Sequence, residues 1–573
     1  DPFYQDLELQ DRLDASERVS QRDSIRNQAI SYTRLKSINL IGVRKQRGPT
    51  QKKDFFDIEN LDFSYAYNEE KRHDYEIEDY TFRNVRMGAG YQYSFSPLNI
   101  EPLAKNSFLS SKKYLQWLSA INLNPIPSNI SLSANINRTF NSQRFREVYL
   151  EGVDAANQLA LPDLQQRNYL FDWIFTLNHN LTNSLRFDFT ATSNNIVRNY
   201  FDTDARGDLV VNQALDIWDG FWDFGDQDRF NQRFGLTYNI PFRLIPLLTF
   251  VDGTYSYSGD FNWQRGSSAL NQVEDEQGNA LGVVNTIQNA NTHNLNTNLN
   301  LNTLYRALKL EKNRKASARK KTKTQIFNSL IGLTTAVRRV QFNYSENNGT
   351  VLPGYTQNIG FFGTSNPGLA FALGDQSDIR FEAAKRGWLT EFPNFNEQFT
   401  QVHNTQFSYT AEVDLLEGMQ LELNGNRNYS ENNAENFLVS NGSYQPLTPI
   451  QYGNFEISTI LIKTAFSSGE VDDQTFENLK SNRLAVAQRL ANARGLDPND
   501  VDADGFPRGY GKTNQAVLIP AFLAAYSGSD VETVDLGATR STPLPNWSLQ
   551  YTGLMRLKFF KKHFRRFSLA HGY

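Results

Sequence analysis

Residues 171–192 show most clearly an alternation of apolar and polar positions that recurs along the whole chain. The apolar row of this stretch consists of Trp173, Phe175, Leu177, Leu181, Leu185, Phe187, Phe189 and Ala191, with His179 as its polar member. The opposite row is largely polar and carries Arg186 and Asp188 after the short turn 182–184. Because side chains alternate faces along a strand, the pattern predicts an antiparallel hairpin with one apolar and one polar face.

The same pattern predicts about 14 strands in the chain. Besides the hairpin, we expect them at 36–44, 60–68, 85–95, 130–137, 234–240, 251–257, 294–303, 340–344, 407–413, 421–425, 547–559 and 567–571. Four regions follow: a polar and helical segment at 1–35, a wall of strands at 36–430, an insertion at 431–546, and a cut hairpin at 547–573. Helices are expected at 18–29, 112–120, 326–337, 476–492 and 516–526.

The apolar face of such strands requires either a second sheet or lipid. Each arm of the hairpin has the ~9–11 residues that cross a bilayer as a tilted strand. Outer-membrane barrels alternate short periplasmic turns with long external loops. Short or compact connections are expected at 45–58, 96–129, 182–184, 241–247, 306–338, 416–419 and 560–565. Longer ones are expected at 69–83, 141–171, 196–231, 260–291, 347–404 and 431–546. The alternation favours a transmembrane antiparallel β-barrel over a soluble β-sandwich or adhesin.

Composition agrees with a barrel and removes several classes of site. The 573 residues include 13% aromatic side chains at a mean hydropathy of −0.55, which is typical of strands and loops that are half polar. There is no cysteine, which excludes disulfides and cysteine-based zinc sites or nucleophiles. No run approaches the ~20 apolar residues of a helical span. The net charge of −4 gives no reason to expect nucleic acid as a partner.

The polar row of the barrel wall is the candidate pore lining. A neutral amide lining presents no strong field to cargo of either sign, unlike the charged rings that select ions. The simpler alternative is that these residues only face water. The predicted pore-lining residues are Arg186, Asp188, Asn294, Asn296, Asn298, Asn300 and Asn302. With this topology, the turn 182–184 is periplasmic, and Trp173, Phe175, Phe187 and Phe189 face lipid.

Few other residues suggest chemistry. Asp500, Asp502 and Asp504 match the first half of a calcium loop, but Gly511 occupies the position of the bidentate Glu, so the alternative is a solvated acidic turn. The six histidines lack zinc-site spacing, and there is no nucleophile elbow or phosphate-binding loop. We therefore expect no enzyme activity and no cofactor. The basic run 312–323 is expected to be a solvated loop or a headgroup contact.

Long segments of the chain resemble a known family. They are GTVLPGYTQNIGFFG (349–363), DIRFEAAKRGWLTEFPNFNEQFTQVHN (378–404), NRNYSEN (426–432), YGNFEISTILIKTAF (452–466), GYGKTNQAVLIPAFLAAYSG (509–528) and residues 543–573. Residues 60–200 also look similar, especially NPIPSNISLSANINR (124–138). The chain resembles the SprA (Sov) family, the outer-membrane translocons of the type IX secretion system of Bacteroidetes, which are linked to gliding motility.

The resemblance implies a protein-conducting channel at the cell surface. It implies a single-chain barrel of roughly 36 strands, of which this chain, expected to be a piece of a larger protein, is an arc. The implied partners are secreted cargo proteins that cross folded, the PorV barrel at a lateral opening, a periplasmic plug protein and outer-membrane lipid. A TonB-dependent receptor or a porin-like barrel for small solutes is the alternative.

Overall fold

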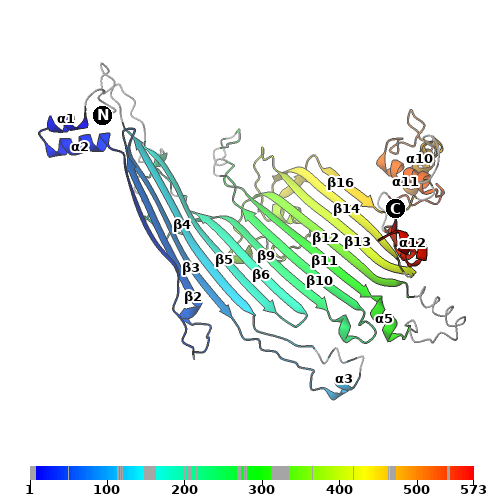
Figure 1. Cartoon of the computed structure of the whole chain (residues 1–573). Coiled ribbons are helices and arrows are strands. Elements are labelled where there is room, and N and C mark those ends of the chain that lie inside the picture. The colour runs from blue at the N-terminus through cyan, green and yellow to red at the C-terminus, as the bar shows by residue number, and fades with distance from the viewer. Residues whose placement is uncertain are drawn as a thin grey trace.

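One broad antiparallel sheet makes up most of the molecule (Figure 1). The computed structural model describes residues 8–573 except 50, 113–114, 116–117, 119–120, 147–162, 199, 204–208, 213–215, 268–272, 277, 279–280, 311–334, 364, 417, 462–463, 465–472 and 538–541. Within the described residues, 16 strands form this sheet, and β7 (Phe201–Thr203) and β8 (Leu209–Val211) form a separate ribbon. The expected all-β antiparallel class is confirmed.

The main strands follow one another across the sheet in chain order. They are β1 (Tyr32–Val43), β2 (Leu61–His73), β3 (Ile77–Ser94), β4 (Asn129–Phe145), β5 (Leu164–Asn180), β6 (Leu185–Ile196), β9 (Asp226–Ile240), β10 (Val251–Gln264), β11 (Asn285–Asn300), β12 (Val337–Tyr355), β13 (Gln398–Leu416), β14 (Met419–Ser440), β17 (Asn546–Tyr551) and β18 (Leu569–Gly572). β15 (Ser443–Pro446) and β16 (Ile450–Ile457) both pair with β14. The sheet is open, with β1 and β18 at its edges.

The helices lie in the connections. They are α1 (Leu9–Asp14), α2 (Val19–Ala29), α3 (Ser107–Ser111), α5 (Leu301–Ala307), α7 (Leu369–Ala372), α8 (Arg380–Lys385), α10 (Asp473–Ala493), α11 (Gln515–Ser527) and α12 (Lys558–His563). The 3-10 turns are η1 (Ile58–Asn60), η3 (Phe242–Leu244), η5 (Phe361–Gly363) and η6 (Gly553–Arg556). α2, α10 and α11 confirm three predicted helices. The helices expected at 112–120 and 326–337 fall mostly outside the described residues.

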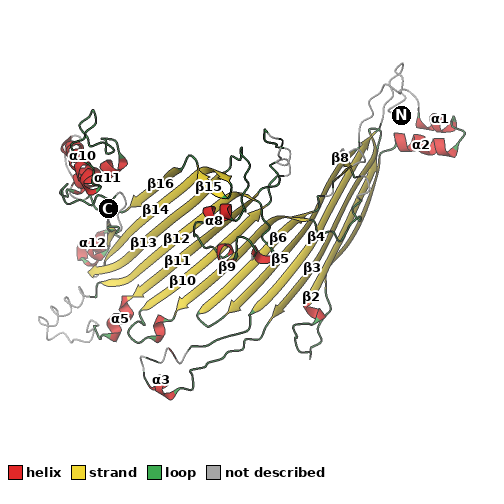
Figure 2. Cartoon of the chain, turned by 180° about the vertical axis from the view of Figure 1, so that it is seen from behind, coloured by secondary structure: helices red, strands yellow, loops and turns green. Residues whose placement is uncertain are grey.

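α10 and α11 form a small unit of their own beyond the sheet (Figure 2). Its core contains Val486, Ala487, Ala491, Val517 and Ala521. α11 begins after Asn514, whose side chain accepts the Ala516 N–H, and ends at Gly528 in the left-handed conformation. Those are the usual signals of a helix start and stop. Among the described residues, no helix is long and apolar enough to cross a bilayer.

The strands differ from the expected ones mainly at their ends. The loop expected at 69–83 is instead strand on both sides of the turn 74–76. β14 continues beyond the expected boundary at 430, to Ser440. The strand expected at 547–559 ends at Tyr551, and α12 occupies part of its range. Backbone pairing extended β2, β3 and β14 into charged sequence because cross-strand hydrogen bonds do not require an apolar row.

Connection lengths at the two ends of the sheet follow the expected rule only in part. The longest connections, 356–397 and 441–545, lie at the same end, and the turns 181–184 and 417–418 lie at the other. The turn 74–76 lies at the long-loop end and is an exception. So are 95–128 and 301–336, which are long although they lie at the opposite end. Loop length alone is therefore a weaker argument for a barrel than the sequence indicated.

The strand register is strongly sheared. The row of partners that starts at His179, near the end of β5, passes through Phe187, Leu236, Tyr257, His293 and Glu346 to Thr405. Thr405 lies well inside β13, which ends at Leu416. Each strand is therefore displaced along its neighbour in a constant direction, which is the stagger that tilted strands need in order to close into a barrel.

Candidate functional site on the polar face of the sheet

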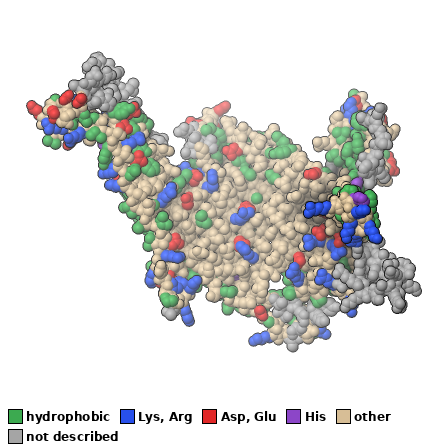
Figure 3. Space-filling view, in the orientation of Figure 1, with side chains coloured by type: hydrophobic (Ala, Val, Ile, Leu, Met, Phe, Trp, Pro, Cys, Tyr) green, Lys and Arg blue, Asp and Glu red, His purple; other side chains and the backbone are tan. Residues whose placement is uncertain are grey.

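One face of the sheet is lined mainly by amide, hydroxyl and glycine residues. A single row of partners across nine strands illustrates this: Asn178, Asp188, Gly235, Ser258, Thr292, Asn347, Asn404, Ser430 and Asn454. Figure 3 views this face, on which tan predominates, the colour of uncharged polar side chains and the backbone, and charged side chains are scattered. The face lies on the inside of the sheet's curve (Figures 1 and 3).

The predicted pore-lining residues occupy this face with one exception. Asn294 lies between Ser256 and Ser345, and Asn296 lies between Thr254 and Asn343. Arg186, Asp188 and Asn298 lie on the same face, and Asn300 is the last residue of β11. Asn302 was wrongly placed in the row, because the chain turns into α5 at Leu301.

Several charges on the polar face form ion pairs of opposite sign. Their N–O distances are 2.9 Å for Arg186–Asp188, 3.3 Å for Arg233–Asp260 and 3.7 Å for Arg339–Glu412. Such exposed pairs contribute little to stability, about 0–1 kcal/mol each. Their effect on the surface is larger, because each pair cancels a charge that would otherwise attract one sign of solute.

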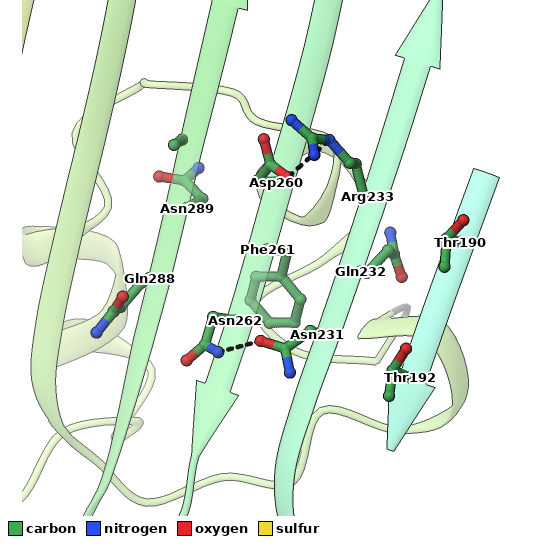
Figure 4. Close-up of a pocket in the computed structure, with 11 residues that line it drawn as sticks. Thr190, Thr192, Asn231, Gln232, Arg233, Asp260, Phe261, Asn262, Gln288 and Asn289 are labelled. Atoms are coloured by element: carbon green, nitrogen blue, oxygen red, sulfur yellow. Dashed lines mark hydrogen bonds and ion pairs between the residues drawn. The ribbon is translucent and has the colours of Figure 1, made fainter. Parts of the chain in front are cut away.

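A hollow of about 220 Å³ lies in the middle of this face (Figure 4). Thr190, Asn231, Asp260, Asn262 and Gln288 line it from β6, β9, β10 and β11. Asn262 donates a side-chain hydrogen bond to Asn231, and Arg233 pairs with Asp260. The lining offers hydrogen bonds to a polar surface, but it presents no nucleophile next to a general base.

The opposite face carries an apolar, aromatic band. On β4 and β5 it includes Ile130, Leu132, Phe175 and Leu177, and ring contacts link β6 to β9 through Phe187 and Phe234 at 5.1 Å. On β12 and β13 it includes Phe342, Tyr344, Phe407 and Tyr409. Because the register is sheared, the band follows an oblique path across the strands, as it must if tilted strands keep it at a constant height.

The segment 356–397 folds back over this apolar face, a feature that the sequence did not indicate. Phe362 of η5 lies 6.1 Å from the ring of Trp173, 5.5 Å from Phe175 and 5.4 Å from Phe189. Phe371 contacts Phe261, and a shared core buries Phe230, Trp263, Ile287 and Leu352. The expectation that only lipid covers Trp173, Phe175 and Phe189 is therefore wrong, because the chain's own insertion packs on them.

Polar side chains on the apolar face hold this insertion. Asn289 donates to the carbonyls of Phe371 at 3.1 Å and Asp375 at 2.5 Å, and Asn291 donates to Gly374 at 2.8 Å. Tyr257 donates to the Leu373 carbonyl at 2.6 Å. These carbonyls lie at the end of α7, where a helix leaves acceptors without partners. Asn289 and Asn291 share their row of β11 with the apolar residues Ile287, Leu295 and Leu299.

The second half of the insertion depends on Arg380. Its guanidinium donates to Asp378 at 2.8 and 2.9 Å and to Glu435 of β14 at 2.5 Å, and it lies 4.7 Å from the ring of Phe399. Tyr444 of β15 also donates to Glu435, at 2.7 Å. These contacts join α8 to the ends of β13 and β14.

Acid should loosen this junction. The hydrogen bond from Arg380 holds the pKa of Asp378 below its ordinary value. Its contribution to stability is therefore present above the ordinary pKa of about 3.9 and is lost as the pH falls through the lowered value. We expect hydrogen exchange of 378–389, corrected for intrinsic pH dependence, to rise below about pH 4 in the wild type. In Asp378→Asn the exchange should be fast already at pH 6, and a steep acid response in that variant would contradict this role.

The remaining candidate residues do not form a site. Asp500 pairs with Arg508 at 2.9 Å, Asp504 pairs with Lys512 at 2.8 Å, and Asp502 accepts the Phe506 N–H at 3.0 Å. These contacts describe an acidic turn, and the described residues contain no group of acidic or histidine side chains arranged to hold a metal. The basic run 312–323 lies outside the described residues.

Comparison with known proteins leaves the family open. No protein-family model matches this chain, and no curated protein matches it. The chemistry of the sheet's two faces is therefore the ground on which a function can be argued.

Proposed function

We propose that this chain forms part of the wall of an outer-membrane β-barrel that conducts folded proteins, as in the SprA-type translocons of type IX secretion. The observation that carries the proposal is the contrast between the two faces of one uninterrupted meander of strands. The inner face is mainly uncharged and hydrogen-bonding, and the outer face has an aromatic band. A membrane barrel needs this division between lumen and lipid.

The geometry of the sheet supports a barrel wall. Antiparallel neighbours in chain order, a constant register shift and a polar face inside the curve all favour closure. Closure would remove the exposed edges at β1 and β18, where unpaired backbone groups are unfavourable in lipid. The strands that complete the barrel would come from other parts of the full protein.

The chemistry of the inner face supports protein cargo. A folded protein presents both charges and apolar patches, so a lumen that lets it pass must bind neither strongly. Amide and hydroxyl rows with paired charges meet that condition, because they hydrogen-bond equally well to water and present no large field. The proposed partners follow from the family resemblance: secreted cargo, the PorV barrel, a periplasmic plug protein and outer-membrane lipid.

The two faces should differ in their access to water. This chain has no cysteine, so once any cysteine elsewhere in the full-length protein is replaced by serine, each introduced one reports alone. In vesicles of the full-length protein, Asn296→Cys on the inner face should react with a charged, membrane-impermeant maleimide. The neighbouring Leu295→Cys on the outer band should react far more slowly and should instead take up a lipid-soluble reagent. Equal labelling of both positions would rule out a wall between water and lipid.

Pore size tests the function directly. Vesicles containing the full-length protein, freed of partner proteins, should release an encapsulated small dye and also an encapsulated folded fluorescent protein. Vesicles loaded in the same way without the protein provide the control. Release of the dye alone would overturn protein conduction and favour a porin-like barrel for small solutes.

A further inference from the structure

The connection between β8 and β9 ends in a segment with unusually exposed aromatic rings. This aromatic loop, Asp216–Gly225, contains Trp218, Trp222 and Phe224, whose exposed fractions are 44%, 66% and 43%. Large aromatic side chains are normally buried, so three of them exposed on one short loop indicate a surface that is covered by something else.

A buried arginine holds the loop in place. Arg138 of β4 is 1% exposed and lies on the outer face of the sheet. It donates to the backbone carbonyls of Ile217 at 3.2 Å, Asp219 at 2.8 Å and Gly220 at 2.5 Å. The rings of Tyr169 and Phe221 lie 4.8 and 5.2 Å from its guanidinium carbon. The loop is therefore fixed against the wall, and its exposed rings do not result from a lack of contacts.

The acidic residues of the loop serve its internal structure. Asp216 pairs with Arg83 at 2.6 Å, Asp219 accepts the Asp216 N–H at 2.8 Å, and Asp223 accepts the Gly225 N–H at 2.9 Å. These bonds shape the turns and leave the rings pointing outward. A segment that was only a solvated connection would not need both the buried hydrogen bonds from Arg138 and exposed tryptophans.

The loop lies at the boundary of the apolar band that is nearer to the end of the sheet with the longest connections. Its Phe224 ring lies 4.4 Å from Phe171 of the band, and its Trp218 ring lies 5.8 Å from Tyr67. Two residues beyond Tyr67 on the same face, Glu69 pairs with Lys36 and Arg83, so the charged surface begins there. The exposed rings thus continue the aromatic surface up to the point where it becomes charged.

We propose that the aromatic loop is a rigid anchor that inserts Trp218, Trp222 and Phe224 into the headgroup boundary of the outer leaflet. This rests on the proposed membrane wall. Tryptophan favours that boundary because its ring is apolar while its N–H needs a polar partner. The hydrogen bonds from Arg138 already fix the conformation of the loop, so insertion costs little conformational entropy. With Asp219 and Asp223 exposed beside the rings, zwitterionic headgroups fit better than anionic ones.

Depth-dependent quenching tests the proposal. The full-length protein carrying Trp222→Cys, labelled with an environment-sensitive fluorophore, is reconstituted in phosphatidylcholine vesicles. The vesicles contain lipids spin-labelled either near the headgroup or near the end of the acyl chain. We expect blue-shifted emission and loss of signal chiefly with the headgroup-proximal label. Leu132→Cys, in the apolar band, should be quenched most by the deep label, and Asn296→Cys, on the inner face, by neither.

The three labels separate the possible failures. If Leu132→Cys is quenched by lipid and Trp222→Cys is quenched only by aqueous iodide, the band faces lipid and the anchor is wrong. If Trp222→Cys is reached neither by lipid nor by iodide, protein covers the loop, which also overturns the lipid anchor. If Leu132→Cys is not quenched by either lipid, the membrane wall itself fails.

Discussion

Replacing Arg138 by methionine should release the aromatic loop from the sheet. The substitution removes the donors to the carbonyls of Ile217, Asp219 and Gly220, which then lie in a site that methionine makes apolar. Hydrogen bonds to a charged group contribute about 1.5–3 kcal/mol each, and they are not additive. We expect a loss of about 3 kcal/mol in the local opening free energy of 216–225, which is about a hundredfold faster exchange.

Hydrogen–deuterium exchange of peptides covering 216–225 measures this effect. The matched control is Arg144→Met in the same strand, because Arg144 is 53% exposed and pairs only at the surface with Asp163. Exposed substitutions of this kind usually change stability by less than about 0.5 kcal/mol. Similar exchange in both variants would show that the loop does not depend on Arg138. In the labelled Trp222→Cys protein, Arg138→Met should also reduce quenching by headgroup-proximal lipid.

Replacing Gly259 by valine should detach the insertion 356–397 from the outer face. A β-carbon at this position would lie 2.0 Å from the Leu373 carbonyl oxygen and 2.6 Å from its carbon. Backbone faces backbone here, so no side-chain rotation can relieve the overlap. Displacing Leu373 also breaks its bond from Tyr257 and weakens those from Asn289 and Asn291. We expect the insertion to lose about 3 kcal/mol, at the upper end of overpacking effects.

Limited proteolysis within 365–391 detects the detached state. Cleavage should begin near α7, because Gly259 faces Leu373 at the end of that helix. Gly235→Val is the control, because the nearest atoms to its β-carbon belong to Asp188 at an ordinary 3.7 Å. Valine suits a strand better than glycine, so this control should fold at least as well as the wild type. Equal protease resistance in the two variants would mean that the insertion is not held at Gly259.

The local pattern of the sequence determined the strands and their two chemistries. Alternation at 171–192 and the asparagine row at 294–300 follow from the two-residue period of a strand, and the structure places both as predicted. α10 likewise follows from helix periodicity and from the stop at Gly495, whereas α11 follows from a run of apolar residues around Pro520. Such signals need no knowledge of the rest of the chain, because each is carried by neighbours in sequence.

Only the tertiary structure decided what covers the outer face and where the strands end. Asn289 reaches Phe371 and Arg138 reaches Ile217 across about eighty residues of sequence, and no periodicity reports such contacts. The early end of the β17 strand, the turn into α5 and the long β2–β3 hairpin depend on which backbone groups find partners. A side-chain pattern specifies which face must be covered, whereas the covering segment is chosen by long-range packing and hydrogen bonding.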